Sequence, residues 1–134
     1  MSGRAVLPWV VAGVALAALG VTLGRSSHGR AVQHPEPRPG ITAANVLPAA
    51  MVPAPGAREA YEAARGAPQI LDGLYCHCNC SKHSGHRSLL TCFESEHGAY
   101  CDICMGEAML ASQLAASGSS LAAIRNAIDA RFGT

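Results

Sequence analysis

The chain has 134 residues and a formal net charge of +1 at neutral pH. This near-neutral balance provides no basic surface for nucleic acid, so we expect no nucleic-acid partner. Aromatic residues make up only 4% of the chain, which excludes a large aromatic core. A domain this small often needs a metal ion or disulfides to supplement its core. No Ser-His-Asp order, glycine-rich phosphate loop or paired-carboxylate motif indicates a hydrolase or a nucleotide enzyme.

An apolar segment lies close to the amino terminus. Residues 6–23 carry no charge, and roughly 20 apolar residues can span a bilayer as a helix. We predict that residues 1–24 form a signal anchor or, alternatively, a signal peptide cleaved near Ala15-Leu16-Ala17. The flanking arginines argue for the opposite orientation, but an early apolar segment normally directs export of the downstream chain. We therefore expect a single-pass protein with an extracytoplasmic soluble domain, which is secreted if the segment is cleaved.

The next stretch, residues 25–56, is rich in proline, alanine and glycine. Proline interrupts helices and sheets and favours extended chain, so we predict a semi-rigid linker. Residues 57–134 then form a small Cys/His-rich domain that we expect to be mainly α-helical. Good helix formers at 58–65 predict a short helix that stops at Gly66, and helical turns follow at 68–75.

All six cysteines lie between Cys76 and Cys104, and four of the six histidines are interleaved with them. An even cysteine count in an exported domain is typical of disulfides, whereas mixed cysteine and histidine is typical of a metal site. Both interpretations stay open at this point.

The run Cys76-His77-Cys78-Asn79-Cys80 is the strongest signal. Alternation places its three cysteines on one side, where thiolates repel one another unless a soft cation binds them. Copper(I), zinc and iron–sulfur centres take such ligands. A disulfide within Cys-x-Cys would close a small, strained ring, so we expect these cysteines to bind metal or distant partners.

Further candidate ligands lie after the run. His83 and His86 are spaced so that a helical turn could aim both rings at one point, although both could equally be solvated loop residues. Cys92 has apolar neighbours and could be a buried, inert thiol. A turn at His97-Gly98 could bring His97 back toward the cysteines.

Cys101-x-x-Cys104 opens a predicted helix at 102–117. The partial positive charge of a helix start acidifies thiols, which suits both metal ligands and redox thiols. Met105 and Met109 share a helix stripe with Cys101. Thioethers favour copper(I), although core packing is the simpler role for both residues.

The carboxy-terminal half is predicted to end in two helices. Ile103, Leu110 and Leu114 form an apolar stripe on the helix at 102–117, which Gly118 stops. A second helix at 121–132 begins after a serine cap, and its stripe is Leu121, Ile124, Ile128 and Phe132. Because the connection is short, the two should pack as an antiparallel hairpin.

Residues 68–133 resemble the bacterial family named for its Pro-Cys-Tyr-Cys-Gly-Cys motif, also described as the CYCXC family of (seleno)proteins. Matching segments include Leu71-Asp72-Gly73-Leu74-Tyr75, Cys92-Phe93, Cys101-Asp102-Ile103-Cys104-Met105 and Arg131-Phe132-Gly133. Tyr75, His77 and Asn79 replace the Pro, Tyr and Gly of the motif, and His77 could add a ligand.

The resemblance implies an exported bacterial protein, often lipid-anchored, so we expect the bacterial cell membrane with the apolar segment in place of the lipid. Selenocysteine in relatives suits a redox or a soft-metal site. A weaker likeness, confined to the helical hairpin, is to the membrane-tethered thiol oxidoreductases of cytochrome c maturation.

These observations predict a membrane-tethered protein that binds, buffers or transfers a metal, copper(I) first and zinc second, and that is not an enzyme. Removal of the metal should unfold the domain. Other expected partners are the membrane and a metal-transfer or redox protein. The predicted ligands are Cys76, Cys78, Cys80, His83, His86, Cys92, His97, Cys101 and Cys104. Of these, the three histidines and Cys92 would complete the site formed by the other cysteines or form a second site nearby. One alternative is a thiol–disulfide oxidoreductase that uses Cys101 and Cys104, and another is an interaction module stapled by three disulfides.

Overall fold

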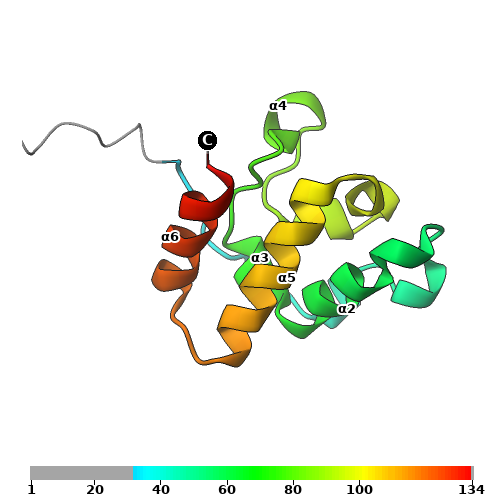
Figure 1. Ribbon diagram of the computed structural model, residues 1–134, viewed down its shortest axis with the longest axis horizontal. Helices are drawn as coiled ribbons and strands as arrows, with labels where there is room; N and C mark the ends of the chain where they lie inside the picture. The colour runs from blue at the N-terminus through cyan, green and yellow to red at the C-terminus, as the bar shows by residue number, and fades with distance from the viewer. Residues whose placement is uncertain (1–31, 134) are drawn as a thin grey trace, which may run out of the picture. The chain divides into compact units, whose positions relative to one another are not determined.

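The computed structural model describes residues 32–133, and throughout this range the regular secondary structure is helical, as predicted (Figure 1). The predicted signal segment, residues 1–24, lies outside the described residues. Among the helices of residues 32–133, none has the length and apolar character needed to cross a membrane.

Short helices precede two longer ones in the chain. The 3₁₀ turns are η1 (Ala43–Asn45), η2 (Ala49–Met51), η3 (Pro55–Ala57), η4 (Leu90–Phe93) and η5 (Glu96–Tyr100). The α-helices are α2 (Arg58–Gly66), α3 (Pro68–Asp72), α4 (Cys80–His83), α5 (Asp102–Ala116) and α6 (Leu121–Phe132).

Helix α5 is central and packs against both α2 and α6 (Figure 1). Its fully buried residues follow helical spacing and are Cys104, Glu107, Ala108 and Ala111. The alanines leave room for the buried face of α2, which is also rich in alanine. The predicted stripe is therefore wrong at Ile103, which is 41% exposed, because the packed face is the one that carries Cys104.

Helices α5 and α6 form the predicted hairpin. Gly118 has φ +84°, the left-handed conformation that glycine tolerates after a helix end. The hydroxyl of Ser120 accepts a hydrogen bond from the Ala123 amide, which caps α6. Ile124 and Ile128 are fully buried, so the core-facing stripe of α6 is confirmed.

Residues 32–56 are part of the folded domain, which corrects the prediction of a linker over 25–56 for the part that the structure describes. Between the prolines, apolar side chains reach the common core; they are Ile41, Val46, Ala49 and Val52. Arg65 donates hydrogen bonds to the carbonyls of Ala43 and Val46. Proline fixes the extended and turn conformations of this stretch but does not prevent its other residues from packing.

The charged side chain of Asp72, at the end of α3, also anchors residues 32–56. Its buried carboxylate accepts hydrogen bonds from the backbone and guanidinium of Arg38, and from Arg87 and Ser88. Burial alone would raise the pKa of Asp72, but the Arg38 and Ser88 hydrogen bonds outweigh it and hold the pKa below its usual range. Asp72 thereby ties the amino-terminal stretch to the loop after the cysteine run.

Candidate metal centre

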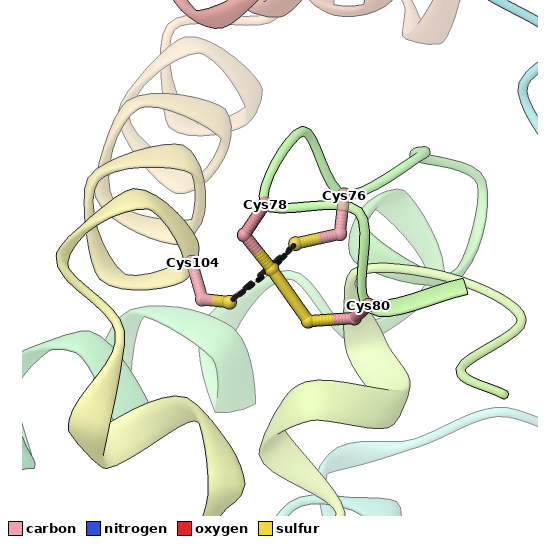
Figure 2. Close-up of side chains that lie close together, drawn as sticks. All are labelled: Cys76, Cys78, Cys80 and Cys104. Atoms are coloured by element: carbon pink, nitrogen blue, oxygen red, sulfur yellow. Dashed lines mark hydrogen bonds between the residues drawn. A yellow bond between two sulfur atoms is a disulfide. The ribbon is translucent and has the colours of Figure 1, made fainter. Parts of the chain in front are cut away.

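The cysteine run lies between α3 and α4, and Asn79 gives it a sharp turn. Asn79 has φ +62°, a left-handed conformation that asparagine tolerates better than most residues. The turn brings the three cysteines of the run together beside α5, where Cys104 faces them from the first turn of the helix (Figure 2). The predicted convergence of the run is therefore confirmed.

The sulfur atoms of Cys76, Cys78, Cys80 and Cys104, which we call the sulfur quartet, all lie within 4.8 Å of one another. Cys76 Sγ is 3.3 Å from Cys78 Sγ and 3.4 Å from Cys104 Sγ, and Cys78 Sγ is 3.5 Å from Cys104 Sγ. The set is buried apart from Cys78, which is half-buried. Four sulfurs at such distances can hold one thiophilic ion.

A disulfide joins Cys78 and Cys80 within the quartet, shown in yellow in Figure 2. The expectation that Cys-x-Cys would not bridge is wrong for this pair. The turn at Asn79 sets the two Cα atoms 5.6 Å apart, inside the range that disulfides require. The remaining cysteines are free thiols, and they are Cys76, Cys92, Cys101 and Cys104.

A second group, which we call the mixed quartet, consists of Cys80, His86, Cys92 and His97. His97 Nε2 lies 3.3 Å from Cys80 Sγ, and His86 Nδ1 lies 3.2 Å from Cys92 Sγ. The predicted return of His97 to the cysteines is thus confirmed. Burial, followed by the charge of His97, lowers the pKa of His86 and favours the neutral imidazole that metals bind.

Cys101 and His83 belong to neither quartet. Both line a hollow of about 300 Å³ together with Cys78, His97 and Tyr100. His83 Nε2 lies 3.2 Å from the carbonyl oxygen of Cys78 and not beside a sulfur. These two predicted ligands therefore lie at the outer side of the site.

The positions of Met105 and Met109 do not support the prediction that these thioethers favour copper(I) binding. Met109 lines a separate hollow between α5 and α6, and Met105 packs against the core. The simpler interpretation, core packing, is therefore confirmed for Met105 and wrong for Met109, which is 37% exposed.

Glu107 is a residue that sequence analysis missed. Its buried carboxylate lies 3.2 Å from Cys76 Sγ and accepts a hydrogen bond from the His77 amide at 2.9 Å. His77 Nδ1 is 2.7 Å from Glu107 Oε1, so this imidazole binds the carboxylate and joins neither quartet. The available signal was a lone acid on the predicted apolar face of the helix, in register with Ile103 and Leu110.

The ionisable groups in and beside the sulfur quartet differ in how readily they lose a proton. Hydrogen bonds from the Cys104 and Cys92 thiols lower the pKa of Cys76 to about 3. The contact with Cys76 raises the pKa of Cys104. Burial, together with the charge of Cys76, raises the pKa of Glu107 to about 10. The two shifts have the same direction: both favour negative charge on the Cys76 sulfur over charge on the Glu107 carboxyl.

A comparison of the sequence with known families identifies the family of this chain. The family model described as a protein of unknown function with PCYCGC motif matches residues 25–134. The chain belongs to the PCYCGC family. No curated protein and no solved structure matches the chain.

The PCYCGC motif aligns with Tyr75-Cys76-His77-Cys78-Asn79-Cys80, and the structure explains its fifth position. Asn79 occupies the glycine position in a left-handed conformation, which glycine adopts without strain. At the proline position, the Tyr75 amide donates a hydrogen bond to His34 Nδ1, which a proline could not do. At the tyrosine position, His77 contacts Glu107. All three cysteines of the motif enter the sulfur quartet.

Proposed function

We propose that this PCYCGC protein binds a thiophilic transition-metal ion in the sulfur quartet once the Cys78–Cys80 disulfide has been reduced. The observation that supports this is the convergence of four sulfur atoms within 4.8 Å. Four thiolates packed so closely repel one another, and a soft cation removes that repulsion. Reduction is required because the metal ligand is the thiolate and not the disulfide sulfur.

The candidate ions are copper(I) and zinc. Copper(I) is favoured by the density of sulfur in the quartet and by the extracytoplasmic setting that the amino-terminal sequence suggests. Zinc is favoured by the tetrahedral fit of four thiolates and by the imidazoles nearby. In the proposed cellular setting, the apolar segment at residues 1–24 tethers the domain to the outer face of a bacterial membrane.

The hollow beside the quartet supports a role in buffering or transfer. Cys78 belongs to the quartet and also lines the hollow, next to Cys101 and His83. A metal ion held by Cys78 is therefore within reach of additional thiol and imidazole donors that face outward. Transfer to a partner protein would proceed by stepwise ligand exchange at this side.

The test is elemental analysis of the full chain, reduced with a dithiol and handled without oxygen or an affinity His tag. We expect near-stoichiometric copper or zinc and thiols that do not react until a chelator is added. Cys104→Ser should lower the metal affinity at least tenfold. Cys101→Ser, the matched control outside both quartets, should retain the metal. Absence of metal from the reduced wild-type protein would reject the proposal.

The disulfide itself favours a second candidate, a thiol–disulfide oxidoreductase that uses Cys78 and Cys80 in place of the predicted Cys101 and Cys104. The Cys78 thiolate would attack a substrate disulfide and release one substrate thiolate. The Cys80 thiolate would then attack Cys78, release the second substrate thiolate and leave the bridge seen in the structure. The protein loses two electrons and the substrate gains them. A mixed disulfide trapped at Cys78 in Cys80→Ser, with no metal bound by the wild type, would favour this candidate.

A further inference from the structure

Cys80 occupies a special position because it belongs to both the sulfur quartet and the mixed quartet. Its side chain is fully buried, and its sulfur lies within 4.8 Å of the sulfurs of Cys76, Cys78 and Cys104 and 3.3 Å from His97 Nε2. A thiolate sulfur has enough lone pairs to bind two metal ions at once. The arrangement therefore differs from two separate sites, which would share no ligand.

The ligands of the mixed quartet are held firmly in place. The His86 amide donates a hydrogen bond to the carbonyl oxygen of Cys80 at 3.3 Å, which fixes His86 beside the shared cysteine. The His97 amide donates to the hydroxyl of Ser95, which caps η5. Gly98 allows η5 to approach η4, since a Cβ there would lie 2.9 Å from the Cys92 carbonyl oxygen.

The net negative charge of the buried thiolates is an independent argument for a second metal ion. One divalent ion in the sulfur quartet leaves four thiolates with excess negative charge in the protein interior, and burying net charge is costly. The mixed quartet adds only one more thiolate, Cys92, because Cys80 is shared and imidazoles are neutral ligands. A second divalent ion thus reduces the net charge of the buried centre.

We propose that the reduced domain holds two thiophilic metal ions, one in each quartet, with the Cys80 thiolate as the bridge between them. This inference rests on the proposed metal-binding function and extends it to a dinuclear centre. In such a centre, an ion bound in the mixed quartet holds the Cys80 sulfur in place. It thereby stabilises the ion in the sulfur quartet, which binds the same sulfur atom.

The test uses cadmium, a thiophilic divalent probe, on the reduced full chain. We expect two bound ions per chain and two ¹¹³Cd NMR resonances that are split by coupling through the Cys80 sulfur. The double variant His86→Gln/His97→Gln keeps every cysteine and replaces only half-buried side chains, so it should fold and bind one ion with no splitting. Lys82→Gln, at an exposed position outside both quartets, is the control and should keep two coupled ions.

The outcomes separate the two proposals. No bound cadmium would reject metal binding altogether. One ion in the wild type would leave metal binding intact and overturn the dinuclear centre. Two resonances without splitting would show independent sites and would overturn the bridging role of Cys80.

Discussion

Glu107 Oε2 lies 3.2 Å from the Sγ of Cys76, and both side chains are shielded from solvent. The contact joins the middle of α5 to the start of the cysteine run, while the His77 amide donates to the other carboxyl oxygen. A protonated carboxyl beside a thiolate places the charge on the sulfur without adding a second buried charge. Glu107 therefore positions Cys76 and belongs to neither quartet.

Substitution of Glu107 tests this positioning role. Glu107→Ala leaves the His77 amide without an acceptor, and we expect it to lower the free energy of unfolding of the reduced, metal-free protein by about 1–3 kcal/mol. Glu107→Gln keeps an oxygen for that amide and should remain within about 1 kcal/mol of the wild type. Urea unfolding followed by circular dichroism measures both. Wild-type stability of the alanine variant would contradict the role.

Asp72 predicts a specific acid sensitivity. Its folded-state pKa is lowered, so the unfolded chain binds more protons at low pH. The stabilisation is complete above the unfolded pKa of about 4 and is lost as the pH falls through the folded value. We expect Asp72→Asn to be less stable at pH 7 by about 1–3 kcal/mol and to show a flatter pH dependence below pH 4. Glu62→Gln, at an exposed position, is the control and should leave the pH profile unchanged.

The packing of residues 32–56 can be tested at Ile41, which is only 4% exposed. We expect Ile41→Ala to lower the free energy of unfolding by about 2–5 kcal/mol, because it removes a buried side chain and leaves a cavity. Met51→Ala, at a residue that is 67% exposed, is the matched control and should change stability little. If residues 32–56 acted as an extended linker, both variants would match the wild type in thermal unfolding.

The Cys78–Cys80 disulfide predicts that metal loading depends on reduction. Thiol titration of the unfolded, oxidised protein should detect the four free cysteines, and the count should rise to six after treatment with a dithiol. Metal should bind to the sulfur quartet only in the second state, because reduction supplies two additional thiolates. Equal metal content before and after reduction would show that the bridge does not control the quartet.

Asn79 tests the turn that shapes the PCYCGC run. We expect Asn79→Gly, which restores the residue of the motif, to fold with near-wild-type stability and metal affinity. Asn79→Ala should cost about 1–2 kcal/mol, since alanine is strained at a positive φ. Parallel measurement of cadmium affinity shows whether this turn also sets the spacing of the sulfurs. Equal behaviour of the alanine and glycine variants would argue against a positive φ at this position.

Local sequence signals determined the helices and the centre of the site. The positions of α2, α5 and α6 follow from helical periodicity, good helix formers and end signals such as Gly118 and Ser120, which act within a few residues. The convergence of the cysteine run was predicted from its alternation, but the structure achieves it through the left-handed turn at Asn79. The apolar segment at residues 1–24 and its membrane role stay predictions, because they lie outside the described residues.

Tertiary packing decided which distant residues meet. Cys104 and not Cys101 joined the quartet, because the side of α5 that carries Cys104 and Glu107 is the buried one. The burial of Ile41 depended on an amino-terminal stretch folding back over the domain. The sharing of Cys80 depended on Cys92 of η4 and His97 of η5 meeting the cysteine run. Local patterns set which way a helix or turn forms, whereas these contacts join residues far apart in the chain and arise only when the elements pack.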